Sequence, residues 1–275
     1  MKKKSPGANN ASVCVTTAEK CLEEAAGNLA ARLDLPLCLP PNGRSYLSHD
    51  FALHLERERL VLRKINDPQL TGAVYADFSR LPVHNRRGVS KSRRIRGGHD
   101  LLLKAVIGKR KTAPSVLDAT GGLGRDAFLL AVRGCRVRLM ERSPIIAALT
   151  ADGLQRAARI PAVRDVVARL SLVQADSLNH LKNMQGEKTG PEVIYLDPMF
   201  PHRKKKARSK KQLLMLQHLI GHDDDADRLL EAALQICRLR VVVKRSRHSP
   251  CLGGLPPSFQ YRGRSTRFDV YLAAR

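Results

Sequence analysis

The stretch with the most specific chemistry is Asp-Pro-Met-Phe-Pro at residues 197–201, which follows a short apolar run. The exocyclic amine of a nucleobase is a weak nucleophile because its lone pair is delocalised into the ring. To attack a methyl group, the amine needs two hydrogen-bond acceptors, so that its nitrogen can become tetrahedral. Asp197 and the carbonyl of Pro198 could be these acceptors, and Phe200 could stack on an unpaired base. The alternative is an ordinary Asp-Pro turn after a strand.

A glycine-rich turn upstream indicates where a methyl donor would bind. Gly122 and Gly124 follow an apolar run and permit a tight turn whose backbone lies close to a ligand. With Ala127, these glycines also fit a dinucleotide fingerprint. Asp118 and Asp126 flank the turn, however, and two carboxylates would repel a pyrophosphate. They would attract the ammonium and sulfonium groups of S-adenosylmethionine (SAM), in which the methyl group is already activated. A purely structural glycine turn is the simpler alternative.

Two further apolar runs end in polar residues that suit the rest of such a donor. Glu141 ends the second run, and a carboxylate there can accept hydrogen bonds from both ribose hydroxyls. Asp176 and Ser177 end the third run and could receive an adenine amino group. Taken alone, Glu141 also fits a surface charge at a strand end, and Asp176 equally fits a helix N-cap.

These residues are separated by a regular alternation of strand and helix patterns, which favours a parallel sheet with helices on both faces. The predicted strands are 116–120, 136–141, 170–175, 193–197 and 239–244, followed by an antiparallel pair at 258–262 and 268–273. The predicted helices are 99–107, 126–133, 144–158, 177–184, 212–220 and 226–236.

The N-terminal part has a different organisation. Residues 1–15 are predicted to be a flexible tail, because they are rich in Lys, Ser, Asn and Gly. Residues 16–83 are predicted to form a small α/β lobe, with a helix over 17–33 and strands at 51–55, 60–64 and 73–78. A basic connector, 84–98, would lead to the main domain, 99–275.

The charge of the chain points to a polyanionic partner. Lys and Arg number 49 against 25 Asp and Glu, a net charge of +24. The connector 84–98 carries six of these cations and no acid, and the run 203–211, directly after the Asp-Pro motif, is also strongly basic. Both could contact phosphates. Because the chain has five Tyr, six Phe and no Trp, we expect one captured base, with the remaining RNA held by charge and shape.

The six cysteines do not predict a metal site. None forms a Cys-x-x-Cys pair and no His cluster accompanies them, so no zinc is expected. This usage fits a reducing cytosol, and we expect a cytoplasmic protein. No run approaches the roughly 18 apolar residues of a membrane span. The protein is expected to act as a monomer.

Four segments together resemble the bacterial small-subunit ribosomal RNA guanine-N2 methyltransferases of the J type. They are Asp-Ala-Thr-Gly-Gly-Leu-Gly-Arg-Asp-Ala-Phe (118–128), Cys-Arg-Val-Arg-Leu-Met-Glu-Arg (135–142), Tyr-Leu-Asp-Pro-Met-Phe-Pro-His (195–202) and Arg-Val-Val-Val-Lys-Arg (240–245). The similarity extends over roughly residues 18–273.

The resemblance implies a Rossmann-like class I methyltransferase sheet with helices on both faces, plus a small N-terminal α/β lobe. It implies SAM as the methyl donor and one guanosine of small-subunit rRNA, free or in an assembling subunit, as the acceptor. It also implies donor contacts at a set of residues that includes two arginines. These positions are Arg125, Asp126, Glu141, Arg142, Asp176, Ser177 and Asp197.

Three other functions compete with this one. A non-catalytic RNA-binding or ribosome-assembly protein on the same fold would not bind SAM. An NAD-dependent oxidoreductase is disfavoured by Asp118 and Asp126. A DNA amino-methyltransferase remains open, because an Asp-Pro-x-aromatic motif does not by itself separate guanine N2 from adenine N6.

Overall fold

The computed structural model describes residues 11–39, 45–67, 70, 72–79, 98–184, 190–199, 208–221 and 223–273. Phe200, most of the connector 84–98 and residues 203–207 of the basic run lie outside these ranges. Contacts divide the chain into two compact units. Unit 1 comprises Met1–Ala76, Ser143–Arg156 and Met199–Asp223, and unit 2 comprises Asp77–Arg142, Ala157–Pro198 and Asp224–Arg275.

Unit 1 contains a three-stranded sheet in the order β1-β2-β3. Strand β1 (Val13–Thr16) is parallel to β2 (Phe51–Leu55), which forms an antiparallel hairpin with β3 (Leu60–Lys64). Helix α1 (Glu23–Leu33) packs against β1 and follows a short 3-10 helix, Lys20–Leu22. The hairpin is where the sequence predicts it, since two apolar runs flank the polar turn at 56–59.

Unit 1 differs from prediction in several elements. The helix predicted over 17–33 is α-helical only from Glu23 and is preceded by the 3-10 helix Lys20–Leu22. Residues 13–15, predicted as part of the tail, lie in β1, because their short apolar side chains are buried against β2. The strand predicted at 73–78 is reduced to a single bridge in which Val74 pairs with Leu62. Two further helices belong wholly or mostly to this unit, α4 (Pro144–Ala158) and α7 (Arg208–Ile220).

Unit 2 contains a seven-stranded sheet in the order β6-β5-β4-β7-β8-β10-β9. The first five strands in this order are parallel, whereas β10 is antiparallel to both of its neighbours. Their bounds are β4 Ser115–Asp118, β5 Arg136–Glu141, β6 Leu170–Gln174, β7 Val193–Leu196, β8 Arg240–Ser246, β9 Phe259–Arg262 and β10 Thr266–Leu272. This agrees with the predicted parallel sheet and its antiparallel end.

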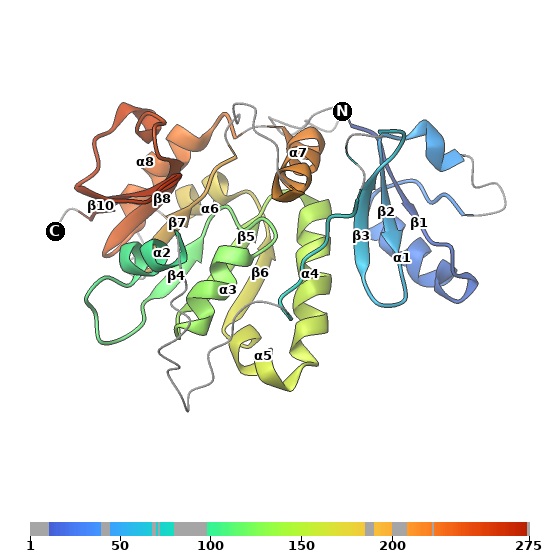
Figure 1. Ribbon diagram of the computed structural model, residues 1–275, viewed down its shortest axis with the longest axis horizontal. Helices are drawn as coiled ribbons and strands as arrows, with labels where there is room; N and C mark the ends of the chain where they lie inside the picture. Colours follow the sequence, from blue (N-terminus) through green and yellow to red (C-terminus); the bar gives the residue numbers. More distant parts are fainter. Residues whose placement is uncertain are drawn as a thin grey trace. The chain divides into compact units, whose positions relative to one another are not determined.

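Helices cover both faces of this sheet, as predicted. Helices α2 and α3 contact each other and lie in front of the sheet, while α6 and α8 contact each other behind it (Figure 1). Their bounds are α2 Gly98–Val106, α3 Arg125–Val132, α5 Pro161–Val167, α6 Ser177–Asn183 and α8 Ala226–Ile236. Helix α5 was not predicted; Pro161 occupies its first turn, where a missing N–H costs nothing.

The core beneath α2 and α3 is formed by apolar residues of both helices and of the central strands. Tyr195, on β7, belongs to this core and is 1% exposed. Its ring is therefore packed tightly enough to fix its hydroxyl at the edge of the sheet. Within the described ranges, no helix is long and apolar enough to cross a membrane.

Candidate active site

In the sheet of unit 2, the order in which successive strands are added reverses between β4 and β7. The chain runs from β4 outward through β5 and β6, and then returns to place β7 on the other side of β4. The carboxyl ends of two such strands border a crevice, which is where α/β proteins bind ligands. The segments after both strands are tied together, since the Ala119 N–H donates to the Tyr195 carbonyl (3.0 Å) and the Asp197 N–H donates to Thr120 Oγ1 (2.6 Å).

Asp118 ends β4 and is almost completely buried. The pKa of its carboxyl group is raised to about 8, mainly by burial and in addition by the negative charges of Asp126 and Asp197. The Thr120 N–H, which donates to Asp118 Oδ1 (3.1 Å), and the Lys244 ammonium act in the opposite direction. A buried acid next to two other acids is a setting that favours the arrival of a cation.

The glycine turn links β4 to α3 and is anchored by Glu141. Gly122 and Gly124 have φ values of 50° and 71°, in the left-handed region where glycine is favoured. Glu141, at the end of β5, is buried and accepts a hydrogen bond from the Gly122 N–H (2.9 Å). The structure thus places this carboxylate directly against the turn, and its contact with the donor ribose stays a prediction.

Asp176 and Ser177 follow β6 and begin α6. Asp176 Oδ1 accepts a hydrogen bond from the Asn179 N–H (2.8 Å), so the N-cap role considered from sequence is present. The buried Ser177 hydroxyl donates to the Ala119 carbonyl (2.7 Å) in the segment after β4. Ser177 therefore lies at the same edge as Asp118, and Asp176 is one residue away.

The two arginines predicted as donor contacts lie in different surroundings. Arg125 is the first residue of α3 and is exposed. Arg142 follows β5, and its guanidinium lies 3.2 Å from Asp225 Oδ1. Arg125 thus follows the glycine turn, and Arg142 directly follows Glu141 at the end of β5.

Lys244 joins two of the predicted site residues. Its Nζ lies 2.8 Å from Asp126 Oδ2 and 2.8 Å from Asp197 Oδ2, and the Tyr195 hydroxyl donates to Asp126 Oδ2 (2.6 Å). Burial disfavours the charge of Lys244, but Asp197 and Asp126 outweigh it and raise the pKa of the ammonium. Burial, together with the same two acids, raises the pKa of Tyr195. Lys244 therefore stays protonated and positively charged, and Tyr195 stays protonated and donates its hydrogen bond to Asp126.

Sequence reasoning missed Lys244 and Tyr195 as site residues. Both residues lie in segments that carry the family resemblance, 240–245 and 195–202, but neither was assigned a role. A signal for Lys244 was present: it interrupts an apolar run at the carboxyl end of a predicted parallel strand, as Asp118 and Asp197 do.

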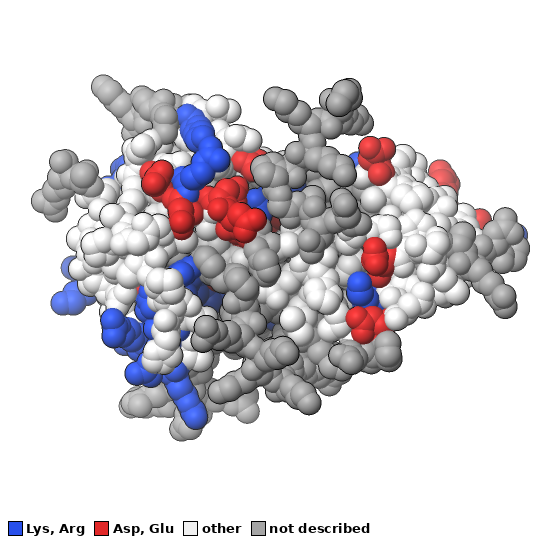
Figure 2. Space-filling model, turned by 90° about the horizontal axis from the view of Figure 1, so that it is seen from above, with Lys and Arg blue, Asp and Glu red and all other residues white. Residues whose placement is uncertain are grey.

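The backbone around the Asp-Pro motif is also held in place. Pro198 is buried, and the following residue, Met199, donates its N–H to Asp223 Oδ2 (2.6 Å) and accepts a hydrogen bond from the Asp223 N–H (3.3 Å). Figure 2 shows Asp and Glu side chains in several groups on one face of the molecule, the largest of them next to Lys and Arg side chains.

Comparison with known proteins decides the family. Residues 44–273 match the SAM_MT family of SAM-dependent methyltransferases. The chain is 44% identical over 249 residues to the ribosomal RNA small subunit methyltransferase J of Dechloromonas aromatica, covering 90% of this chain and 96% of that protein. It is 43% identical over 266 residues to the protein of the same name from Pectobacterium atrosepticum, covering 95% and 99%. The chain belongs to the ribosomal RNA small subunit methyltransferase J family.

A solved structure agrees with this assignment. The SAM-dependent methyltransferase NGO1261 from Neisseria gonorrhoeae superposes with a TM-score of 0.70 at 32% sequence identity, covering 94% of this chain and 95% of that one. The resemblance predicted from four motifs is confirmed, and so is the class I methyltransferase fold. Family membership also confirms SAM as the methyl donor and this chain as a methyltransferase, in agreement with the acids at the glycine turn.

Proposed function

We propose that this enzyme transfers the methyl group of SAM to N2 of one guanosine in small-subunit ribosomal RNA. The observation that carries the proposal is the juxtaposition of Asp197, after β7, with Asp118 and Asp126 at the glycine turn. The names of its relatives, which are 43–44% identical, support small-subunit rRNA as the substrate class. The predicted division into a lobe at 16–83, a connector and a main domain at 99–275 stays a prediction.

The donor side of the site is formed by the acids and the turn. Bound SAM supplies a methyl group that is activated as a sulfonium. In the proposed site, Asp118 and Asp126 attract its positive groups, Gly122 and Gly124 admit it close to the backbone, and Glu141 accepts the ribose hydroxyls. The remaining proposed contacts to the donor are Arg125, Arg142, Asp176, Ser177 and Asp197.

This set of residues fits SAM better than an anionic cofactor. Three carboxylates lie close enough for Asp126 and Asp197 to influence the pKa of Asp118. A cation entering the site would offset the repulsion among these acids, whereas a pyrophosphate would add to it. Lys244 supplies one positive charge to this group, since its Nζ contacts both Asp126 and Asp197.

The acceptor side is formed by the Asp-Pro motif. Asp197 and the Pro198 carbonyl accept the two hydrogens of the guanine amine as its nitrogen attacks, and Phe200 stacks on the base. Lys244 holds one oxygen of Asp197 and so fixes the carboxylate in orientation. Alignment supplies much of the rate, since the methyl group is already activated and no strong base is needed.

The net charge of +24 supports a polyanionic substrate, which the connector 84–98 and the basic run 203–211 would hold through its phosphates. Small-subunit rRNA as the substrate supports a cytoplasmic location for the enzyme. We propose that it acts there as a monomer.

Mass spectrometry of rRNA nucleosides from cells with and without the gene tests this function. We expect N2-methylguanosine in small-subunit rRNA to fall by one residue per ribosome when the gene is deleted. Wild-type protein should restore it, and Asp197→Ala should not. Asp165→Ala, which removes an exposed acid on α5, is the matched control and should restore it fully. An unchanged nucleoside profile in the deletion strain would count against the function proposed.

A further inference from the structure

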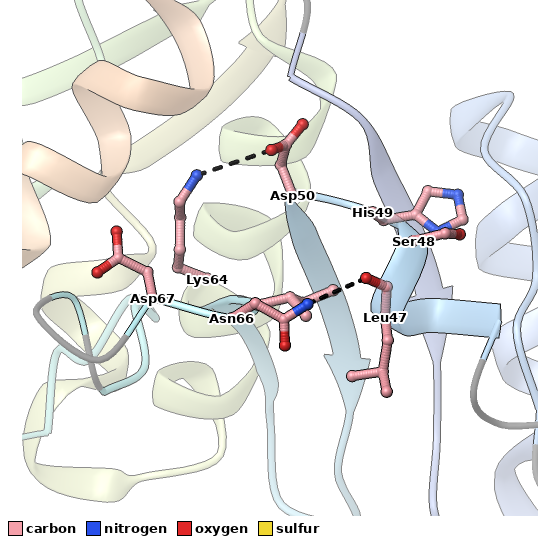
Figure 3. A pocket seen from close by; sticks show the side chains of 8 residues that line it. Leu47, Ser48, His49, Asp50, Lys64, Asn66 and Asp67 are labelled. Carbon is pink, nitrogen blue, oxygen red and sulfur yellow. Dashed lines mark hydrogen bonds and ion pairs between the residues drawn. The ribbon is translucent and has the colours of Figure 1, made fainter.

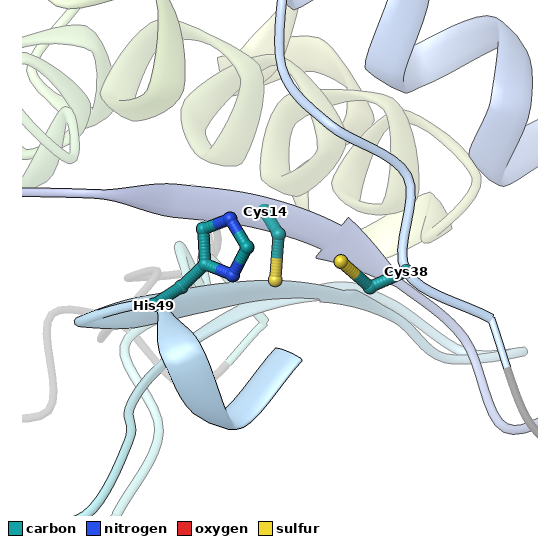
Figure 4. A group of neighbouring side chains, drawn as sticks. All are labelled: Cys14, Cys38 and His49. Carbon is teal, nitrogen blue, oxygen red and sulfur yellow. The ribbon is translucent and has the colours of Figure 1, made fainter. Parts of the chain in front are cut away.

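Three residues that bind soft metals meet in unit 1, and none of them belongs to the site described above. Cys14, Cys38 and His49 are far apart in the sequence, yet their two Sγ atoms and one imidazole nitrogen lie within 4.8 Å of one another. Figure 4 shows the two thiols and the imidazole ring turned toward a common point. The proposed methyl-transfer reaction uses none of these side chains.

The backbone holds the three residues on adjacent segments. Cys14 lies in β1, and the Cys38 N–H donates to the Val15 carbonyl of that strand (2.9 Å). The Thr16 hydroxyl donates to the Cys38 carbonyl (2.6 Å), which fixes the segment a second time. On the other side, Asp50 donates its N–H to the Ser12 carbonyl (3.0 Å) and so brings its neighbour His49 beside β1. The arrangement is therefore set by the fold.

The ligand types point to zinc rather than to a hard cation. Cysteine sulfur and histidine nitrogen are the ligands that Zn²⁺ prefers, whereas Mg²⁺ and Ca²⁺ select oxygen. Bonds of about 2.0–2.3 Å to a tetrahedral ion place its ligand atoms roughly 3.5–3.8 Å apart. The observed upper limit of 4.8 Å needs only small side-chain rotations to reach that spacing. Cys14 and Cys38 are buried, so these ligands would be shielded from competing water.

A pocket in unit 1 shares His49 with this group. The pocket has a volume of about 620 Å³ and lies between residues 47–50 and 64–67 (Figure 3). His49 lines it directly, and Ile65 both lines it and packs against Cys14 and Cys38. The carboxylates of Asp50 and Asp67 also line it. The pocket thus places space and two carboxylates beside His49.

We propose that Cys14, Cys38 and His49 bind one Zn²⁺ ion, with water from the pocket as the fourth ligand. Binding displaces the two thiol protons, and the ion joins β1 to the segments around Cys38 and His49. Its role is to stabilise unit 1, because a ligand that binds only the folded state shifts the unfolding equilibrium. No zinc site was expected because the sequence has no Cys-x-x-Cys pair and no His cluster beside its cysteines. Cys14, Cys38 and His49 are instead brought together by contacts between distant segments.

Cobalt substitution in the full-length protein tests the site. Protein reduced with a phosphine and stripped with a chelator is titrated with Co²⁺, and thiolate-to-cobalt charge-transfer absorption is recorded. We expect one equivalent to bind and to be displaced by Zn²⁺. Cys14→Ser and Cys38→Ser should each lose the charge-transfer band. His49→Gln, at a partly exposed position, should keep the fold and weaken Zn²⁺ binding by at least about tenfold, since one of three protein ligands is lost.

Matched cysteine variants separate this site from adventitious binding. Cys21 is exposed and Cys237 is buried elsewhere, so Cys21→Ser and Cys237→Ser should leave the cobalt spectrum unchanged. Zn²⁺ should raise the melting temperature of the wild-type protein but not that of His49→Gln. A spectrum without charge transfer, or one that survives both Cys14→Ser and Cys38→Ser, would overturn the proposal. The proposal would also be overturned if the reduced protein bound neither Co²⁺ nor Zn²⁺ and air oxidation joined Cys14 and Cys38 in a disulfide.

Discussion

Lys244 lies between Asp126 and Asp197, with its Nζ 2.8 Å from one carboxylate oxygen of each. Asp126 comes from the start of α3 and Asp197 from the segment after β7, so one ammonium connects the two proposed halves of the site. The side chains of Lys244 and Asp197 are 29% and 40% exposed, respectively. Such a pair is partly screened by water, and its main effect is to fix orientation rather than to stabilise the fold.

Replacing Lys244 by methionine should therefore lower turnover more than donor binding. Met keeps much of the side-chain volume but removes the ammonium that contacts Asp197, so the acceptor amine meets a less ordered carboxylate. We expect kcat to fall about tenfold or more, while the Kd for SAM changes by less than about threefold, because the remaining acids still attract a cation. Single-turnover methyl transfer and calorimetry measure the two quantities. Lys244→Arg retains the positive charge, so its kcat should fall less. A wild-type kcat for Lys244→Met would refute the positioning role of Lys244.

The raised pKa of Asp118 predicts how donor binding depends on pH. Because this pKa is about 8, the carboxyl group is mostly neutral at pH 7 and becomes ionised as the pH rises through 8. A cationic donor prefers the ionised form, so its binding should release a proton and become tighter as the pH increases toward 8, levelling off above it. Calorimetry in buffers with different ionisation enthalpies measures this proton release.

Two comparisons isolate the contribution of Asp118 to that pH dependence. Asp118→Asn removes the titrating group and should flatten the dependence of SAM affinity on pH. S-adenosylhomocysteine lacks the sulfonium charge, so its affinity for the wild-type protein should vary less with pH than that of SAM. An equally steep dependence in Asp118→Asn would assign the titration to another group.

Much of the site was predictable because of one topological property. Parallel strands end at the same edge of a sheet, so the polar residues that follow predicted strands must converge there. Asp118, Glu141, Ser177 and Asp197 could all be selected in this way, and each lies at that edge. The glycine spacing and the flanking acids then favoured a cationic donor, which family membership confirms.

The residues that sequence patterns missed depend on contacts between distant segments. Lys244 reaches Asp197 only because β7 and β8 are neighbours in the sheet, and nothing in the local pattern around either residue encodes that pairing. Val13–Thr16 forms a strand only because β2 lies beside it. Cys14 and His49 likewise come together through the fold. Periodicity describes one segment at a time, so such pairs are invisible to it.

Glu141 offers a test of the donor pocket that leaves the turn intact. Its Oε2 accepts the Gly122 N–H (2.9 Å), and the carbonyl oxygen of glutamine can accept the same bond. Glu141→Gln should therefore preserve the turn but lose the charge that strengthens hydrogen bonds from the ribose. We expect the Kd for SAM to rise about tenfold, corresponding to about 1.4 kcal/mol, with kcat at saturating SAM affected less. Calorimetry measures the affinity. An unchanged Kd for SAM in Glu141→Gln would contradict the proposed contact between Glu141 and the ribose.

Gly124 tests how tightly the turn is packed. It begins α3 with φ 71°, and a Cβ added there would lie 3.1 Å from Phe78 Cζ and 3.2 Å from Leu139 Cδ2. The Phe78 ring is buried and stacked on Phe128, so it has little room to move. Gly124→Ala should cost about 1–2 kcal/mol for the left-handed backbone and about 1–3 kcal/mol more for overpacking.

Gly254 provides a matched control for this variant. Its φ is also left-handed, at 68°, but an added Cβ would have nothing within 4 Å. Gly254→Ala should therefore show only the backbone cost of about 1–2 kcal/mol. Urea denaturation followed by circular dichroism gives both values, and SAM binding should weaken in Gly124→Ala alone. Equal losses of stability in the two variants would mean that Phe78 and Leu139 yield to the extra methyl group, and that the turn is less constrained than its contacts indicate.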